Sequence, residues 1–135
     1  MRRSSLLLVA LVLTGFGADV TKISSADAAH LVTEGKAVLV DVREPAEWAD
    51  TGVAAPAHLI PKSDFDGQQE LWRPFLERVA GRQIILYCRS GHRAGLVAAA
   101  LAGKGYATAN AGGLHDWQAA GLPVRPATAP PAAQK

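Results

Sequence analysis

The sequence predicts a single α/β domain in which a mostly parallel sheet is covered by helices. Short apolar runs typical of strands alternate along the chain with stretches of helical spacing, which is the pattern of strand-helix-strand units. Two of these runs, at residues 37–40 and 84–87, are continuously apolar, as in strands that are buried on both faces. We therefore expect these two strands to lie at the centre of the sheet.

Two helices are expected before and after the first of these strands. Ser24 or Ser25 can cap a helix that runs to about Glu34, because a serine hydroxyl accepts a hydrogen bond from a first-turn amide. Pro45 suits the first turn of a short second helix, where a missing N–H group costs nothing. Gly52 is expected to close that turn.

The middle of the chain carries weaker signals. A short strand is expected at residues 57–60, where Pro61 ends it. Residues 69–79 have apolar side chains at helical spacing, but Pro74 lies within this segment and leaves the start or straightness of the helix open.

The C-terminal half contains the clearest helix, at residues 94–102, because this segment is rich in alanine and leucine. A last short strand is expected at residues 107–110, a last helix at 113–119 and an exit turn at 121–124. The final residues, 126–135, are dominated by alanine and proline and are expected to form a disordered tail.

The N-terminus has the layout of a secretory signal peptide. Arg2 and Arg3 precede an apolar run at residues 6–13, and small residues follow the run. The run is shorter than the roughly 18 to 20 apolar residues of a membrane span. We expect residues 1–18 to be a signal peptide, with an uncleaved anchor or a buried helix as alternatives.

Export would place the mature domain, residues 19–125, in the periplasm or outside the cell. The formal net charge of +2 arises from 14 Lys and Arg residues against 12 Asp and Glu residues, and two of the arginines belong to the export segment. The remaining charges balance, so the sequence does not predict a nucleic-acid-binding surface.

Cys88 is the only cysteine in the sequence, so no disulfide can form within the chain. It directly follows a buried strand, and a short loop separates it from the alanine-rich helix. Unpaired backbone N–H groups and the helix dipole favour an anion at such a junction. The segment after the cysteine, called the cradle loop below, consists of Arg89, Ser90, Gly91, His92 and Arg93.

The composition of the cradle loop favours a reactive thiolate over an inert buried cysteine. Gly91 permits a tight bend, and the two arginines add positive charge near the sulfur. His92 could polarise the site or act as a general base, although a loop that already ionises the thiol does not require one.

The spacing of the loop and of the histidines bears on two other chemistries. Phosphatases of the cysteine type place an arginine six positions after the nucleophile, whereas Arg93 follows Cys88 by five, and the smaller loop fits one sulfur atom better. The histidines have no close ligand spacing, and one cysteine cannot build a structural zinc site. No metal site is therefore expected at His30, His58, His92 or His115.

Three motifs together resemble the rhodanese family of sulfurtransferases over nearly the whole mature domain. Residues 41–43 match the Asp-x-Arg motif that follows a central strand, and residues 88–93 match the active loop. The Gly112–Gly113 pair, Trp117 and residues 121–124 match the C-terminal signature. The resemblance implies a three-layer α/β fold with a central, mostly parallel five-stranded sheet flanked by helices.

One segment, residues 52–61, departs from the family pattern. The family usually reads Gly-His-Ile-Pro-Gly-Ala-x-Asn-Ile-Pro here, and this chain has Val53 and Leu59 in place of the histidine and the asparagine. These positions generally support the fold, so the departure bears on local geometry and substrate access rather than on the class of reaction.

The resemblance also implies a two-step sulfur transfer. The Cys88 thiolate would take the outer sulfur of thiosulfate or a related donor and hold it as a persulfide. A thiophilic acceptor such as cyanide, a thiol or a protein partner would then remove it. No metal or organic cofactor is needed, and the protein is expected to be a monomer.

The resemblance implies roles for the residues around the cysteine. All five residues of the cradle loop would form the substrate-binding site, with Arg89 and Arg93 attracting the anionic donor. Alternatively, Asp41 or Glu44 holds Arg93 inward and leaves Arg89 as the substrate contact. Asp41 and Arg43 would support the loop.

Two other functions compete with an active transferase. A persulfide carrier would hand sulfur to a protein partner with little turnover. A phosphatase or arsenate reductase is disfavoured by the short loop.

Overall fold

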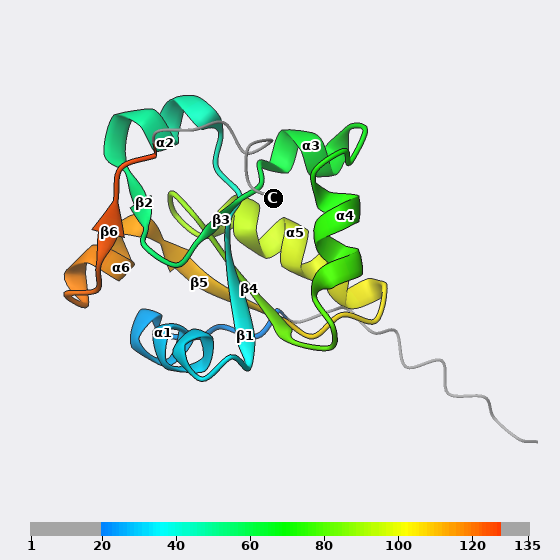
Figure 1. The fold of residues 1–135 in the computed structure, drawn as a ribbon, viewed down its shortest axis with the longest axis horizontal. Helices are drawn as coiled ribbons and strands as arrows, with labels where there is room; N and C mark the ends of the chain where they lie inside the picture. Colours follow the sequence, from blue (N-terminus) through cyan, green and yellow to red (C-terminus); the bar gives the residue numbers. More distant parts are fainter. Residues whose placement is uncertain (1–19, 128–135) are drawn as a thin grey trace, which may run out of the picture.

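The computed structural model describes residues 20–127, and it places helices on both faces of a central sheet (Figure 1). This is the mixed α/β architecture that the sequence predicts. The expected signal peptide, residues 1–18, and residues 128–135 of the expected tail lie outside the described residues.

The central sheet is parallel, and the described residues contribute four strands to it in the order β3-β1-β4-β5. The predicted runs at 37–40 and 84–87 form the two inner strands, as expected. Five strands were expected. In place of a fifth strand, the described residues have a single parallel bridge between Lys22 and Asn110, beside β5. The strands are β1 (Ala37–Asp41), β3 (His58–Leu59), β4 (Gln83–Cys88) and β5 (Thr108–Gly113).

The inner strands are continuously apolar because alternate residues enter two different cores. Leu39 and Ile85 belong to one cluster of buried side chains, whereas Val40 and Leu86 belong to another on the opposite face. Cys88, the last residue of β4, belongs to the second cluster. The cysteine therefore ends a strand with no solvent-exposed face.

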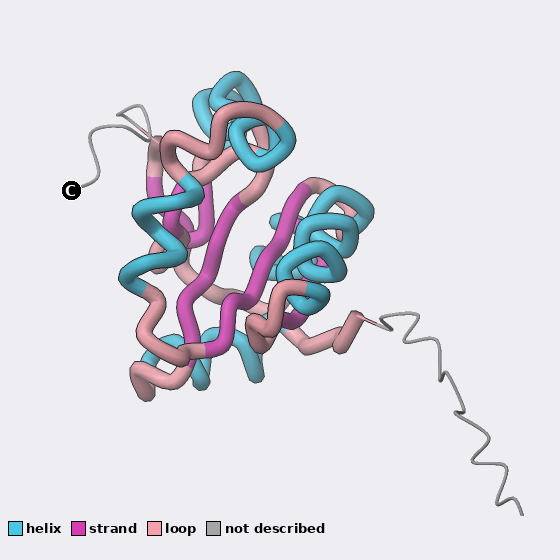
Figure 2. Tube along the Cα trace, turned by 90° about the vertical axis from the view of Figure 1, so that its right-hand side faces the viewer, coloured by secondary structure: helices cyan, strands magenta, loops and turns pink. Residues whose placement is uncertain are grey.

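The helices cover the two faces of the sheet (Figure 2). Helices α1 (Ser25–Thr33) and α6 (Leu114–Ala119) contribute to the first core. Helices α4 (Trp72–Arg78) and α5 (His92–Gly103) contribute to the second, and α3 (Lys62–Asp66) contacts α5. As predicted, a serine caps α1: the Ser24 hydroxyl accepts a hydrogen bond from the Asp27 amide at 3.1 Å.

The helix predicted at 69–79 begins later than its apolar spacing suggests. Because α4 starts at Trp72, Pro74 falls in its first turn, where its missing N–H group breaks no helical hydrogen bond. The preceding loop is held by the Asp64 carboxylate of α3, which accepts hydrogen bonds from three successive backbone amides, Glu70 to Trp72. The proline therefore marks the start of the helix.

A second, two-stranded sheet joins the middle of the chain to its C-terminal end. Strand β2 (Val53–Ala54) pairs antiparallel with β6 (Val124–Arg125), so the end of the expected exit turn is a strand. The Arg125 guanidinium donates hydrogen bonds to the carbonyl groups of Ala55 and Ala57 at 3.0 and 2.9 Å. Ala127 packs against the first core.

Both departures from the family pattern lie inside the protein. Val53 has no exposed surface, and Leu59 is 1% exposed. Each belongs to the first core, so apolar packing occupies the positions where polar side chains are usual in the family.

Candidate active site

The site is built where β4 ends and α5 begins. Cys88 is 1% exposed, and its Sγ accepts hydrogen bonds from the backbone amides of Gly91, at 3.0 Å, and Ala94, at 3.5 Å. Gly91 adopts a left-handed conformation, with φ of 96°, that turns the chain from strand to helix. Two amide dipoles thus point at the sulfur, an arrangement that favours a negative charge there.

The side chains of the cradle loop differ in their partners. Arg89, Ser90 and His92 are exposed, and within residues 20–127 their side chains make no hydrogen bond or ion pair. Arg93 is partly buried, and both of its terminal nitrogens donate hydrogen bonds to the carboxylate of Glu47. Arg89 is therefore the cation of the loop that is available to an anionic ligand.

Arg93 is held by Glu47 of α2 (Pro45–Thr51), and not by Asp41 or Glu44 as the sequence analysis allowed. Its two terminal nitrogens donate to the two carboxylate oxygens of Glu47 at 2.7 and 2.8 Å. The hydrogen bond from Arg93 lowers the pKa of Glu47 to about 2. The same hydrogen bond raises the pKa of Arg93 above its ordinary value.

Sequence reasoning missed Glu47 because the two partners lie 46 residues apart. A signal for its local role was present: Glu47 is the third residue of α2 and accepts a hydrogen bond from the Glu44 amide at 2.9 Å, as in a capping box. Nothing in that pattern indicates the second partner.

Asp41 and Arg43 pair with each other beneath the surface. Arg43 is 3% exposed and donates to both carboxylate oxygens of Asp41, which has no exposed surface. Arg43 also donates to the Thr51 hydroxyl and the Gly52 carbonyl, each at 2.9 Å. The pair therefore braces the end of α2, the helix that carries Glu47. It also adjoins the strand that ends at Cys88, because Asp41 is paired with Tyr87 in the sheet.

The end of β5 packs directly against the cradle loop. Gly113 is paired with Cys88 in the sheet, and a side-chain carbon at this position would lie 2.8 Å from the Arg89 carbonyl carbon and still closer to its oxygen. Such a distance is too short for any residue but glycine. The Gly-Gly pair of the C-terminal signature thus has a steric reason to be glycine at its second position.

Asn110, which sequence reasoning did not single out, joins β5 to the loop by its side chain. Its Nδ2 donates to the Gly91 carbonyl at 2.8 Å, and its Oδ1 accepts from the Gly112 amide at 2.9 Å. Gly91 is the residue whose own amide contacts the sulfur. The only sequence signal was the position of Asn110, two residues before the Gly-Gly pair.

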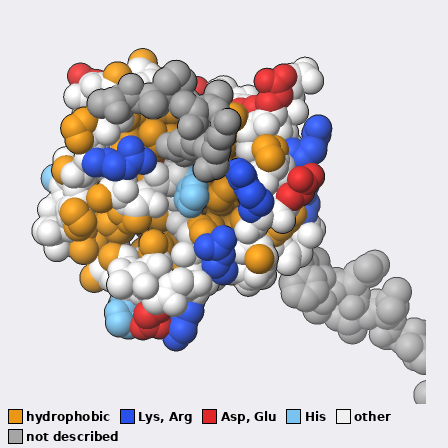
Figure 3. Space-filling view, in the orientation of Figure 1, with side chains coloured by type: hydrophobic (Ala, Val, Ile, Leu, Met, Phe, Trp, Pro, Cys, Tyr) orange, Lys and Arg blue, Asp and Glu red, His pale blue; other side chains and the backbone are white. Residues whose placement is uncertain are grey.

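The described residues offer no metal centre: no group of three or more His, Cys, Asp or Glu side chains among them could hold a metal ion. None of their helices is long and apolar enough to cross a membrane. On the face shown in Figure 3, basic side chains are interspersed with acidic ones and form no continuous basic surface.

Fold and site together define an α/β domain in which two backbone amides point at one thiol between a parallel strand and a helix. Residues 24–120 match the model of the rhodanese-like domain. The chain therefore belongs to the rhodanese-like domain family, and this membership supports a sulfurtransferase-type activity.

Solved structures agree with this assignment. A rhodanese-related protein from Thermoplasma volcanium is 28% identical with a TM-score of 0.65, and the match covers 79% of this chain and 99% of that one. No curated protein matches the chain.

Two more distant structures share the fold. A protein of unknown function from Rhodopseudomonas palustris, described as a possible tyrosine phosphatase, is 22% identical with a TM-score of 0.67, covering 93% of this chain and 99% of that one. The homodimeric polysulfide-sulfur transferase of Wolinella succinogenes is 24% identical with a TM-score of 0.63, covering 82% of each chain.

Proposed function

We propose that this protein is a sulfurtransferase that moves sulfane sulfur from thiosulfate, or a related donor, to a thiophilic acceptor such as cyanide or a thiol. Cys88 carries the sulfur as a persulfide. The observation that supports this proposal most directly is the convergence of the Gly91 and Ala94 amides on the Cys88 sulfur at the start of α5.

In the first step the Cys88 thiolate attacks the outer sulfur of thiosulfate. A sulfur-sulfur bond forms to Cys88, the sulfur-sulfur bond within thiosulfate breaks, and sulfite leaves with the electron pair of that bond. In the second step cyanide attacks the outer sulfur of the persulfide. Thiocyanate leaves, and the Cys88 thiolate is restored without any external oxidant or reductant.

The charges of the loop suit these two steps. The loop amides stabilise the sulfur anion both before and after transfer. Arg89 contacts the donor and the departing sulfite, because its guanidinium has no partner within residues 20–127. Arg93 braces the loop, since its charge is already matched by the Glu47 carboxylate.

A persulfide carrier that serves a protein partner is a second candidate. The observation that favours it is the exposure of Arg89, Ser90 and His92, whose side chains have no partner within residues 20–127 and can contact a protein surface. A phosphatase or arsenate reductase is not favoured by a loop in which the closing arginine follows the cysteine by five positions.

Steady-state transfer assays on the purified protein test the proposal. We expect sulfite release from thiosulfate and thiocyanate formation from cyanide, both abolished in Cys88→Ser and retained in a Ser63→Ala control. Persulfide formation without turnover, seen as the mass of one added sulfur atom, would establish the carrier. Hydrolysis of p-nitrophenyl phosphate without sulfite release would refute sulfur transfer.

We also propose that the protein is exported and works as a monomer in the periplasm or outside the cell. The arginines and the apolar run at residues 6–13 support export. Fractionation of cells followed by N-terminal sequencing tests it: the exported chain should begin after Gly17 or Ala18. Recovery of the full-length chain in the cytoplasm alone would contradict export, and size-exclusion chromatography would reveal a dimer.

A further inference from the structure

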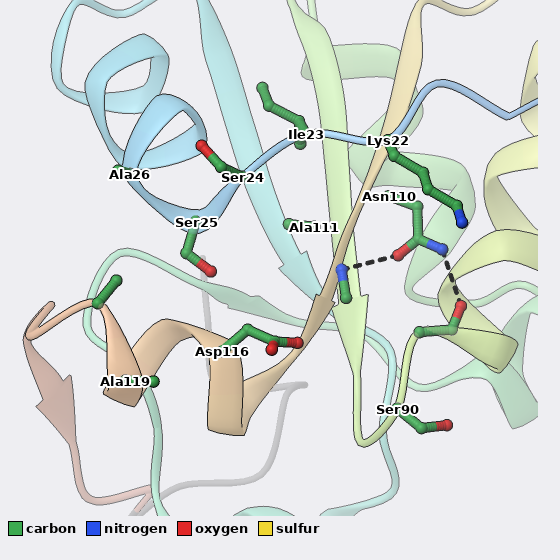
Figure 4. Close-up of a pocket in the computed structure, with 13 residues that line it drawn as sticks. Lys22, Ile23, Ser24, Ser25, Ala26, Ser90, Asn110, Ala111, Asp116 and Ala119 are labelled. Atoms are coloured by element: carbon green, nitrogen blue, oxygen red, sulfur yellow. Dashed lines mark hydrogen bonds between the residues drawn. The ribbon is translucent and has the colours of Figure 1, made fainter.

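A cleft of about 670 Å³ lies beside the cradle loop, on the side of α1, β5 and α6 (Figure 4). The start of α1 and helix α6 form two of its walls, and the end of β5 lies between them. Ser90 and Gly91 of the cradle loop complete the lining, whereas Cys88 does not reach it. The cleft is therefore a separate cavity that shares one wall with the sulfur site.

The wall formed by α1 is rich in hydrogen-bond donors. The first amides of this nine-residue helix have no helical partner, and Ser24 satisfies only the amide of Asp27. The positive end of the helix dipole adds to their attraction for an anionic group. Lys22, just before the helix, also lines the cleft.

Ser25 provides an independent sign that a polar ligand belongs here. The residue is 7% exposed, and its buried hydroxyl has no hydrogen-bond partner in the protein. Figure 4 shows this hydroxyl pointing into the space between α1 and α6. A buried hydroxyl without a partner is costly, because it has lost its hydrogen bonds to water and gained none.

The wall formed by α6 carries the opposite charge. The Asp116 carboxylate lines the cleft, and its Oδ2 accepts a hydrogen bond from the Gly113 amide at 2.9 Å. Its Oδ1 has no hydrogen-bond partner among the described residues. One wall therefore attracts a negative group, and the other attracts a positive one.

We propose that this cleft binds the head group of an α-amino acid. The ligand carboxylate lies at the start of α1, where the helix amides and the Ser25 hydroxyl donate to it, and the ligand ammonium faces Asp116. A simple anion would be repelled by Asp116, and a simple cation by the helix dipole. Small apolar residues fill the remaining wall and suit a short aliphatic side chain: Ala26, Ala111, Ala119 and Ala120.

This proposal goes beyond sulfur transfer and does not depend on it. The cleft takes nothing from Cys88, so a Cys88→Ser protein should bind the amino acid with unchanged affinity. Loss of transferase activity and loss of amino-acid binding are thus separate results.

Nuclear magnetic resonance titration of the full chain tests the site, with alanine as the probe. We expect saturable shifts at residues 24–26, 90, 91 and 116, and no such shifts with acetate or methylammonium at equal concentration. The proposal would be overturned if acetate bound as tightly as alanine, or if the shifts caused by alanine did not saturate.

Matched variants test whether the α1 wall binds the ligand carboxylate and the α6 wall binds the ligand ammonium group. Asp116→Asn keeps an oxygen for the Gly113 amide but removes the charge, and it should weaken alanine binding at least about tenfold. Ser25→Ala should weaken it about threefold or more. Thr33→Ala, at the other end of α1, should leave it unchanged. Wild-type affinity in both Asp116→Asn and Ser25→Ala would refute the assignment. The titrations of the wild-type protein with alanine, acetate and methylammonium test the site even if a variant fails to fold.

Discussion

Glu47 and Arg93 hold the cradle loop to α2 through two parallel hydrogen bonds, although 46 residues separate them in the chain. The geometry is the two-point pairing that guanidinium and carboxylate groups form best. Both side chains are about 30% exposed, so the pair matters more for the orientation of the loop than for overall stability.

Glu47→Gln should therefore lower kcat/KM for sulfur transfer severalfold while reducing the free energy of unfolding by only about 1 kcal/mol. The variant keeps an oxygen for the Glu44 amide but weakens the bond to Arg93. Steady-state assays and urea unfolding measure the two effects. As a control, Glu77→Gln on α4 changes an exposed acid that is remote from the loop. An unchanged kcat/KM in Glu47→Gln would show that the ion pair does not position the loop.

The same pair sets a pH dependence of stability. The pKa of Glu47 is lowered from 4.5 to about 2 in the folded protein, so the folded state binds its proton less tightly than the unfolded state does. The contribution of Glu47 to stability is complete at pH values above 4.5, the pKa of this group in the unfolded chain, and it is lost as the pH falls toward 2. The difference in unfolding free energy between wild type and Glu47→Gln should hold constant from pH 7 to about 5 and shrink below that. A difference that stays constant down to pH 3 would contradict the assignment.

Gly113→Ala should damage the cradle loop directly. Its new methyl group would meet the backbone of Arg89, which cannot move without displacing the residues that follow Cys88. We expect a loss of about 2 kcal/mol in unfolding free energy, typical of overpacking, and at least a tenfold loss of transfer activity. Gly103→Ala is the matched control, since a methyl group at the end of α5 meets nothing within 4 Å. Full activity in Gly113→Ala would mean that the loop tolerates a shift at Arg89.

Asn110→Asp tests the link between β5 and the loop. The substitution keeps an acceptor for the Gly112 amide but turns the donor to the Gly91 carbonyl into an oxygen, which the carbonyl repels. Because the Gly91 amide contacts the Cys88 sulfur, we expect alkylation of Cys88 by iodoacetamide to slow about tenfold at pH 7. Thr108→Val, which removes a hydrogen bond from β5 to the Ala98 carbonyl, should not change this rate. Equal alkylation rates in wild type and Asn110→Asp would remove Asn110 from the site.

The sequence was sufficient for the parts of this protein that depend on local patterns. Continuous apolar runs predicted the two inner strands, and the passage from strand to alanine-rich helix located the loop after Cys88. Contacts between segments that are far apart in the chain could not be predicted from the sequence. The Glu47 partner of Arg93 and the pairing of β2 with β6 join segments far apart in the chain, and two-residue strands carry no periodicity. Helix α3 is likewise too short for a helical pattern.

Arg89→Ala separates donor binding from the support of the loop. The guanidinium of Arg89 has no partner within residues 20–127, so its removal should leave the unfolding free energy within about 0.5 kcal/mol of wild type. The KM for thiosulfate should rise about tenfold or more, because the divalent donor loses its nearest unpaired positive charge. The dependence of kcat/KM on salt should also become shallower, since fewer charges attract the donor. Arg73→Ala, at an exposed position on α4, serves as the matched control and should change none of these three quantities. An unaltered KM in Arg89→Ala together with a raised KM in Arg93→Lys would transfer the donor contact to Arg93 and require the bond to Glu47 to open during turnover.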